Sequence, residues 1–334
     1  MKSVIFIGGT SYSGSTLFDL FLSNSPDAFS CGEVHALFHP YRKHHINPEC
    51  GCGDENCHLW TKVHARGAKN LYQSIFNEFP NINTIIDSSK DPLWINDRMK
   101  ELQKSKIQTK NILIWKSPEE FYSSCKKRNK ENNWQTAWMN YHRLYFRMIK
   151  NWQAVQYSNF AQFSETRAGV CEYLDLPFEE SKNQFWNKQH HTLFGNTSAK
   201  IHLYEQSSTA YKQCQAELNE KIATPDTEIS EENNFQKIYY SKPSDDDVND
   251  HNITNKQKIA VIQSILNKKD VSQQNRQNTD IILNQYAIDQ LKSSQTYFMQ
   301  NRIKNLVRRL KVLPQYLLTM SPLNSNESTS RQAS

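Results

Sequence analysis

Apolar and polar positions in the first 200 residues follow two alternating patterns. Three short, continuous apolar runs rich in β-branched residues predict strands buried on both faces: Ser3–Gly8, Thr84–Ser88 and Asn111–Lys116. Helical patterns lie between and after them, at Thr16–Leu22, Arg98–Lys104, Glu119–Lys130 and Trp134–Trp152. Strands that alternate with helices predict an α/β fold in three layers, with a central parallel sheet covered on both faces.

The pattern changes near residue 205. The polar stretch from Ala223 to Lys256 contains two prolines and the acidic run Asp245–Asp247, as a linker or insertion does. Helical patterns return at Gln257–Lys268 and Ile281–Leu313. We therefore predict four segments: an α/β domain at 1–205, a polar linker or insertion at 206–256, a mostly helical C-terminal extension at 257–320 and a disordered tail at 321–334.

A glycine-rich loop joins the first predicted strand to the first predicted helix. It reads Gly8-Gly9-Thr10-Ser11-Tyr12-Ser13-Gly14-Ser15-Thr16. In such a strand–loop–helix unit, backbone N–H groups and the helix dipole bind a phosphate, and glycines let the ligand approach the backbone. The Gly9–Gly14 spacing and the Thr16 hydroxyl fit a Walker A motif, but Ser15 replaces the lysine that reaches the transferred phosphate. We therefore predict a P-loop-like core that lacks the phosphate-binding lysine of an NTPase.

The loop resembles the 5′-phosphosulfate loop of sulfotransferases that use 3′-phosphoadenosine 5′-phosphosulfate (PAPS). Ser13-Gly14-Ser15-Thr16 matches the core of that family's loop, whereas Tyr12 stands where the family has Lys or Arg. A phenol donates a hydrogen bond but brings no positive charge. The resemblance implies that Ser11, Tyr12, Ser13, Gly14, Ser15 and Thr16 contact the donor PAPS.

Two later features extend the resemblance over residues 1–200. The family binds the 3′-phosphate with a basic residue at a strand end and a serine eight residues on, which are Lys116 and Ser124 here. The family's usual residue is arginine, and lysine is a point charge without the bidentate fork. A Gly–Asn pair late in the family's domain lies near the 3′-phosphate, which implies a contact from Asn196 in Gly195-Asn196.

Two residues fit the chemistry of sulfuryl transfer, which needs a base for the acceptor proton and cations for the developing negative charge. Cys31-Gly32-Glu33 and Lys90-Asp91-Pro92 resemble motifs of the tyrosylprotein and bacterial branch. That resemblance implies Glu33 as the general base and Lys90 as the stabiliser of the transferring group. The alternatives are an exposed Glu33 and a surface Lys90 paired with Asp87 or Asp91. The histidines nearby are less favoured candidate bases, as in the cytosolic branch of the family: His35, His39, His44 and His45.

A cysteine cluster follows these histidines. Cys50, Cys52, Cys57 and His58 are four candidate zinc ligands, but their close spacing matches known zinc motifs poorly. Similar stretches that end in a tryptophan, here Trp60, occur in related bacterial sulfotransferases. We favour a structural or redox-sensitive loop over a zinc site, and expect no metal in the reaction.

Composition and charge narrow the classes of partner. The 334 residues carry 40 basic and 34 acidic side chains, a net charge of +6 that suits an anionic ligand but is too small and scattered for nucleic acid. Seven cysteines and no secretory signal argue against a disulfide scaffold, and no run reaches the roughly 20 apolar residues of a membrane span. We expect a soluble cytoplasmic protein. A basic amphipathic pattern at 302–311 fits a helix face packed on the domain better than one resting on an anionic membrane.

The sequence therefore predicts a sulfotransferase that moves a sulfuryl group from PAPS to a hydroxyl or amine. The acceptor is a small molecule, a carbohydrate or a peptide, and the sequence does not separate these classes. The first alternative is a P-loop kinase or other NTPase, opposed by Ser15 and by the lack of an acidic magnesium ligand beyond Asp87. The second is a non-catalytic nucleotide-binding protein derived from a sulfotransferase, which Tyr12 and Lys116 keep open.

Overall fold

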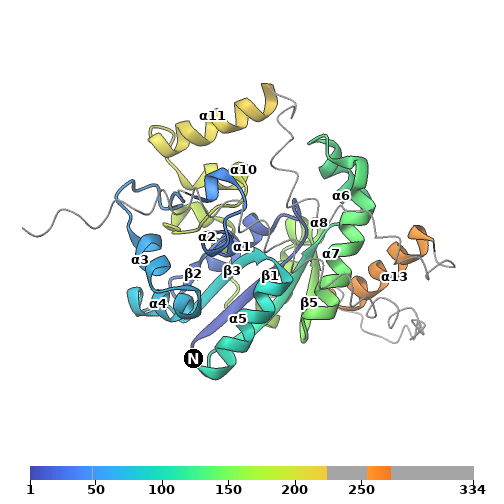
Figure 1. The fold of residues 1–334 in the computed structure, drawn as a ribbon, viewed down its shortest axis with the longest axis horizontal. Coiled ribbons are helices and arrows are strands. Elements are labelled where there is room, and N and C mark those ends of the chain that lie inside the picture. The colour runs from blue at the N-terminus through green and yellow to red at the C-terminus, as the bar shows by residue number, and fades with distance from the viewer. Residues whose placement is uncertain (47, 224–253, 272–334) are drawn as a thin grey trace, which may run out of the picture.

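The computed structural model describes residues 1–46, 48–223 and 254–271 (Figure 1). The strands are β1 (Ser3–Gly8), β2 (Ala28–Ser30), β3 (Thr84–Lys90), β4 (Gln108–Trp115) and β5 (Trp152–Gln156). The α-helices in the described residues are α1 (Ser15–Ser23), α2 (His35–Phe38), α3 (Leu59–Ala65), α4 (Leu71–Glu78), α5 (Pro92–Lys104), α6 (Pro118–Lys126), α7 (Trp134–Met148), α8 (Tyr157–Gln162), α9 (Ser164–Leu174), α10 (Thr197–Lys200), α11 (Thr209–Ala223) and α13 (Asn255–Lys268).

The five strands form one parallel sheet in the order β2-β3-β1-β4-β5. The register places Gly8, the last residue of β1, opposite Lys90 on one side and Leu113 on the other. The loop after β1 and the ends of β3 and β4 therefore meet at one edge of the sheet. Ligands of open α/β sheets bind at this carboxyl edge, near the point where the strand order reverses.

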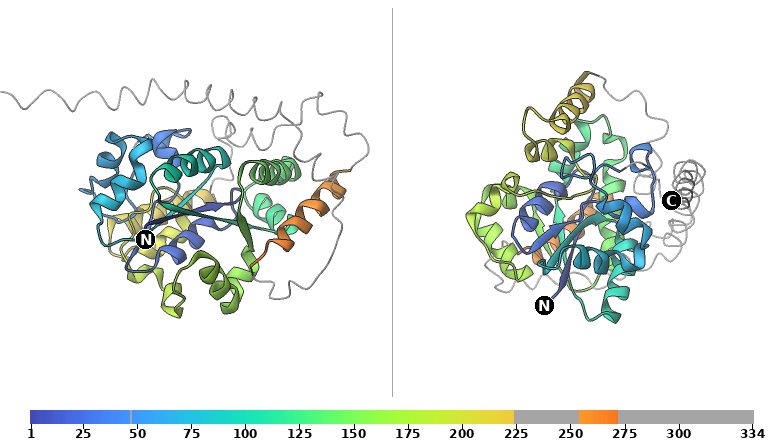
Figure 2. Two further views of the ribbon diagram at one scale, coloured as in Figure 1. Left: turned by 90° about the horizontal axis from the view of Figure 1, so that it is seen from below. Right: turned by 90° about the vertical axis from the view of Figure 1, so that its left-hand side faces the viewer.

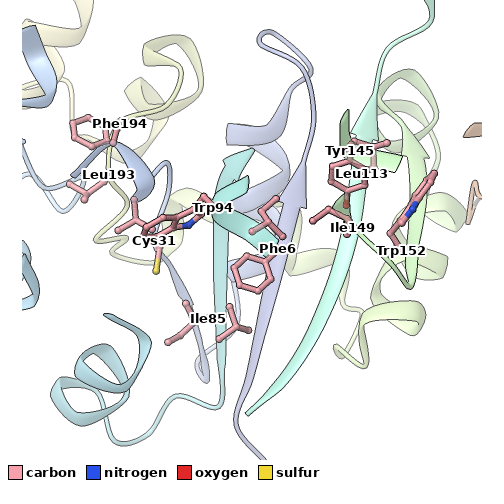
Figure 3. Packing of buried hydrophobic residues seen from close by; sticks show 14 of the residues in the cluster. Phe6, Cys31, Ile85, Trp94, Leu113, Tyr145, Ile149, Trp152, Leu193 and Phe194 are labelled. Carbon is pink, nitrogen blue, oxygen red and sulfur yellow. The ribbon is translucent and has the colours of Figure 1, made fainter. Parts of the chain in front are cut away.

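Both faces of the sheet are covered, which explains the continuous apolar run of β1. Val4 and Phe6 pack on the face that carries α4, α5, α7 and α13, and Figure 3 shows part of this cluster. Ile5 and Ile7 pack on the opposite face, under α1, α8 and α9. The layers are visible in Figure 2. The predicted α/β class and the parallel sheet are confirmed.

Two strands were not predicted from the sequence. β2 has only three residues, and β5 begins at Trp152, the last residue of the helix predicted over Trp134–Trp152. α7 instead ends at Met148, and the chain turns at Asn151, whose φ of 51° is left-handed. Trp152 stacks on Phe146 at a centroid distance of 5.0 Å, so the aromatic pattern continues although the helix has ended.

Some predicted boundaries also shift. α5 begins at Pro92 instead of Arg98, because the Asp91 carboxylate accepts the N–H groups of Leu93 and Trp94 and proline fits the first helical position. α6 ends at Lys126 instead of Lys130. β3 includes Lys90, which was predicted to lie just past the strand.

Residues beyond the predicted boundary at 205 pack on the α/β core. α11 lies inside the predicted linker 206–256. Ile262 and Leu266 of α13 are fully buried in the core cluster, and the Ala154 N–H of β5 donates to the Lys269 carbonyl at 2.7 Å. The predicted helix at 281–313, the basic stretch 302–311 and the tail 321–334 lie outside the described residues. Within the described ranges, no helix combines the length and apolarity needed to cross a bilayer.

Candidate functional site

The phosphate loop presents an uncapped helix N-terminus. Gly14 is the N-cap of α1 with φ 93°, and no side chain caps the N–H groups of the first turn. These groups have no partner inside the helix and attract an anion together with the helix dipole. A Cβ on Gly14 would lie 2.3 Å from the ring of Tyr157, and one on Gly9 would lie 2.5 Å from Ser13 Oγ. The sequence needs glycine at both positions for the loop to close this tightly.

Two hydroxyl groups of the loop are buried with their hydrogen-bonding capacity unused. Within the described part of the chain, Thr10 Oγ1 and Ser13 Oγ have no hydrogen-bond partner. Leaving a buried hydroxyl unpaired costs about 1–3 kcal/mol. Thr16 Oγ1 accepts the Asn196 N–H at 3.0 Å and keeps its own proton to donate. The oxygens of a bound phosphate or sulfuryl group would pair all three hydroxyls, so the loop fits such a ligand.

Cations gather beside the loop at the end of β4. Lys116 Nζ donates to Ser124 Oγ at 3.0 Å and lies 4.7 Å from the ring centre of Tyr157. Partial burial, with a contribution from nearby Arg128, lowers the pKa of Lys116. An anion at Lys116 would offset both effects.

Arg128 was missed in the sequence analysis. Its guanidinium lies 4.4 Å from the ring centre of Tyr12 and donates to the Ser124 carbonyl at 2.8 Å. It therefore brings a positive charge to the position where Tyr12 supplies none. The available signal was its place one helical turn after Ser124.

Glu33 and Lys90 form an ion pair at the carboxyl edge of the sheet. Lys90 Nζ contacts Glu33 Oε1, and both side chains are largely shielded from solvent, at 14% and 21% exposure. Lys90 has a left-handed φ of 64°, a conformation that costs a non-glycine residue about 1–3 kcal/mol and is often found at functional sites. The alternatives of an exposed Glu33 and a Lys90 paired with Asp87 or Asp91 do not describe this structure.

Backbone contacts hold Glu33 in place. Its N–H donates to the Leu193 carbonyl at 2.9 Å, and the Gly32 carbonyl accepts the Ser88 N–H at 3.0 Å. A Cβ on Gly32, which has φ 63°, would lie 2.0 Å from the Leu193 carbonyl oxygen. The Gly32-Glu33 turn is therefore fixed between β3 and the segment around Leu193.

Tyr141 links this pair to the phosphate loop. Its hydroxyl accepts the Gly9 N–H at 2.6 Å and donates to the Lys90 carbonyl at 2.7 Å. Tyr141 lies on α7 between Trp138 and Tyr145, and both of those side chains are fully buried. No signal in the sequence distinguishes Tyr141, whose hydroxyl bonds to Gly9 and Lys90, from its buried aromatic neighbours.

Asp87, the candidate magnesium ligand considered from the sequence, accepts hydrogen bonds on both carboxylate oxygens. Oδ2 accepts from the Tyr72 hydroxyl at 2.6 Å and from Trp94 Nε1 at 2.9 Å, and Oδ1 accepts the Ser89 N–H at 2.8 Å. The carboxyl group is fully buried, and desolvation raises its pKa. Asp87 therefore holds β3 and α5 together from a fully buried position.

The histidines after Glu33 divide into two groups. His35 and His39 lie at ring distances of 5.3 and 5.8 Å from Trp94, beside the Glu33 turn. His45 is buried, its Nδ1 accepts the Tyr41 N–H, and desolvation lowers its pKa to about 2. His45 is therefore a neutral structural residue, and His44 packs against it.

The cysteine cluster recruits a histidine that is distant in sequence. Cys50, Cys52, Cys57 and His191 place one candidate ligand atom each within 4.8 Å of one another. His58, the predicted fourth ligand, is exposed at the start of α3 and does not belong to this group.

Together these features define the class of the molecule as an α/β protein with a P-loop-like strand–loop–helix unit and an acid–base pair beside it. No protein-family model and no curated protein matches the chain. Among solved structures, the chain is similar to a sulfotransferase domain from the curacin biosynthetic pathway, with 14% identity and a TM-score of 0.46 over 80% of this chain and 98% of that one. It is also similar to a sulfotransferase domain from the Synechococcus PCC 7002 olefin synthase, with 12% identity and a TM-score of 0.43 over 80% and 94% of the two chains.

Proposed function

We propose that this protein is a PAPS-dependent sulfotransferase. The observation that carries the proposal is the Glu33–Lys90 pair, which lies beside a phosphate loop that has no Walker lysine. Sulfuryl transfer needs a base and a cation at the reacting centre, with no metal-bridged β- and γ-phosphates. An NTPase would need a magnesium ligand, and Asp87 has both oxygens engaged.

The loop and the end of β4 would hold the donor. The N–H groups of Gly14, Ser15 and Thr16, with the side chains of Ser11, Tyr12 and Ser13, would bind the 5′-phosphosulfate. Lys116 and Ser124 would bind the 3′-phosphate, and Arg128 would add its charge between the two groups. Asn196 supports the loop through its N–H bond to Thr16 Oγ1. The rings of Tyr12 and Tyr157, which contact Arg128 and Lys116, are candidate stacking surfaces for the adenine ring.

PAPS supplies an activated sulfuryl group with a phosphate as leaving group. Glu33 would take the proton of the acceptor hydroxyl while the acceptor oxygen bonds to sulfur. The bond between sulfur and the bridging oxygen breaks, and its electron pair stays on the 5′-phosphate. Lys90 would donate a hydrogen bond to the bridging oxygen and so stabilise the charge that develops there.

The residues around Glu33 favour an acceptor with a flat or apolar face. His35 and His39 pack near Trp94, and the His35 N–H donates to Ser89 Oγ at 2.9 Å, one residue before Lys90. These rings are beside the proposed base, where the acceptor must lie. Phenols and sugar rings are the first acceptors to test.

The deciding experiment is a calorimetric titration with 3′-phosphoadenosine 5′-phosphate, the desulfated product, beside ATP and AMP. We expect micromolar binding that requires the 3′-phosphate. Lys116→Ala should weaken it at least tenfold, about 1.4 kcal/mol, because Lys116 supplies the charge at that phosphate. Lys126→Ala is the matched control, because Lys126 is exposed on α6, the helix that follows Lys116, and this variant should bind like the wild type.

Each other outcome has a definite meaning. Equal or tighter binding of ATP, or no binding of any nucleotide, would overturn the proposal. Specific binding of the 3′-phosphorylated nucleotide with no turnover across acceptors, and no effect of Glu33→Gln, would replace it with the non-catalytic nucleotide-binding protein.

A further inference from the structure

Three thiols and one imidazole gather at a second place in the molecule, apart from the phosphate loop. Cys50, Cys52 and Cys57 come from the loop before α3, and His191 comes from a segment more than 130 residues further on. All three cysteines are free and partly buried. We propose that Cys50, Cys52, Cys57 and His191 bind a zinc ion that fastens these two segments together.

The distances suit a tetrahedral ion. Zinc binds sulfur at about 2.3 Å and nitrogen at about 2.0–2.1 Å, which places a nitrogen and a sulfur ligand about 3.5 Å apart and two sulfurs about 3.8 Å apart. His191 Nδ1 lies 3.3 Å from Cys50 Sγ and 3.6 Å from Cys57 Sγ. All four ligand atoms lie within 4.8 Å of one another, so closing on an ion needs movements of about an ångström or less.

The imidazole is already oriented toward the thiols. Its ring lies parallel to Phe29 at an interplanar angle of 9° and a centroid distance of 6.1 Å. The His191 carbonyl accepts a hydrogen bond from Trp60 Nε1 at 2.7 Å, which fixes the backbone. Groups around a metal site that orient its ligands in this way lower the cost of binding.

The cysteine loop is held against the same segment. The Gly51 N–H donates to the Thr192 carbonyl at 2.8 Å, and a Cβ on Gly51 would lie 2.6 Å from that oxygen. Glycine between Cys50 and Cys52 therefore allows the two backbones to touch. Because the cysteine loop lies directly against the segment that carries His191, the short Cys-x-Cys spacing is compatible with a four-ligand site.

The ligand set indicates a structural role for the ion. Four protein ligands close a tetrahedral zinc, and a catalytic zinc keeps one position for water. Three thiolates also favour zinc over the harder ions magnesium and calcium. His58 adds nothing to this set, because its side chain is exposed.

Zinc here would stabilise a segment that touches two parts of the candidate site. Two residues after His191, the Leu193 carbonyl accepts the Glu33 N–H at 2.9 Å. Three residues further on, the Asn196 N–H donates to Thr16 Oγ1 at 3.0 Å. The ion would thus position both the Glu33 turn and the phosphate loop from outside the reacting centre. The inference does not depend on the proposed function, because metal content is measured without an activity.

The test is the metal content of the full chain, purified without a histidine tag and without chelators. Elemental analysis should find zinc in equimolar amount to protein. His191→Ala and Cys57→Ser should lower the zinc content at least tenfold, whereas His58→Ala should leave it unchanged. The His191 and His58 variants give the sharpest contrast. His58 is next to Cys57 in sequence, but only His191 places a ring nitrogen among the thiols.

A second measurement protects the test against misfolded variants. Wild-type protein stripped with a chelator is titrated with Co²⁺, and a tetrahedral thiolate site should give intense visible d–d bands at one equivalent, lost on adding Zn²⁺. Chelation should also lower the melting temperature, and zinc should restore it. Three results would each overturn the proposal. The first is zinc below a tenth of an equivalent together with no cobalt bands, and the second is iron in place of zinc. The third is zinc that is lost in His58→Ala and kept in His191→Ala.

Discussion

The two sides of the candidate site are built in different ways. The phosphate side consists of the loop Gly9–Thr16 with Lys116 and Ser124. The loop follows β1, Lys116 follows β4, and Ser124 lies on α6, the next helix. The bridged side consists of Cys31–Glu33, the cysteine loop 50–57 and the segment 190–196, held by isolated contacts such as Gly32 with Leu193 and Cys50 with Leu193. Local sequence determines the first, and contacts between distant segments determine the second.

This difference suggests separate roles for the two sides, donor binding for the phosphate side and positioning of Glu33 for the bridged side. The loop of the phosphate side is anchored at both ends, by β1 and by α1. The bridged side positions Glu33 through a segment about 160 residues away in sequence, which links the proposed base to the Cys50–His191 cluster. Variants of the phosphate side should therefore change donor affinity, and variants of the bridged side should change turnover.

The largest effect is expected for Glu33→Gln. Loss of a general base typically lowers the rate by about 10²–10⁴-fold. The amide cannot take the acceptor proton, whereas the donor site is untouched, so affinity for 3′-phosphoadenosine 5′-phosphate should stay within twofold. Turnover is measured as the formation of 3′-phosphoadenosine 5′-phosphate from PAPS, with the best acceptor from a panel of phenols, sugars and tyrosine peptides.

Glu119→Gln is the matched control for this prediction. Glu119 is exposed at the start of α6 and lies on the other side of the site, so its amide variant should turn over like the wild type. If Glu33→Gln weakens nucleotide binding as much as it lowers turnover, the two sides are not separable as described.

Gly14→Ala should give the next largest effect, on the phosphate side. A Cβ at this position would lie 2.3 Å from the Tyr157 ring, and φ is 93°. The loop must shift, and we expect nucleotide affinity to fall roughly 30-fold, about 2 kcal/mol. Calorimetry of binding and urea unfolding together separate this effect from a loss of fold.

Gly67→Ala separates steric conflict from backbone strain. Gly67 has a similar φ of 80°, but an added Cβ would meet nothing within 4 Å. Its alanine variant should therefore lose about 1 kcal/mol of stability and no nucleotide affinity. Equal losses of affinity in the two variants would mean that the close packing of the phosphate loop on Tyr157 plays no part.

The phosphate side was largely predictable from the sequence. Each of its features follows a strong local pattern: a β-branched run, a glycine loop, a helix start with Pro118 and Glu120. In the structure, Lys116 Nζ donates to Ser124 Oγ at 3.0 Å. The sequence could not reveal Arg128 at Tyr12, because that contact depends on where α6 lies relative to the loop.

The bridged side was predictable in its members but not in its contacts. Glu33 and Lys90 were selected by motif, and nothing in the spacing shows that they touch. The fourth member of the cysteine cluster was assigned to His58 because it is adjacent, whereas His191 reaches the thiols across the fold. The predicted helix was extended to Trp152 for the same reason, because Trp152 continues the aromatic pattern of α7 through a tertiary contact, its stacking on Phe146.

The smallest predicted effect concerns acid stability, and it involves His45, which packs on the bridged side. His45 packs on Phe194 at 4.7 Å, and burial, with the nearby His44, Arg42 and His35, lowers its pKa from 6.5 to about 2. Above pH 6.5 it is neutral in the folded and unfolded chains and contributes no pH dependence. Below that pH the unfolded chain takes up a proton that the folded chain refuses, so stability falls by about 1.4 kcal/mol per pH unit.

His45→Asn should remove this slope, because its amide oxygen can accept the Tyr41 N–H as Nδ1 does and does not titrate. Urea unfolding at pH 7.5, 6.5 and 5.5 should show the variant losing about 1 kcal/mol less than the wild type between the last two values, because the unfolded His45 is already half protonated at pH 6.5. His58→Asn, at an exposed position, should follow the wild-type curve. Parallel curves for His45→Asn and wild type would mean that His45 gains a proton in the folded chain. In that case the contact between the His45 turn and Phe194 would loosen in acid before the protein unfolds.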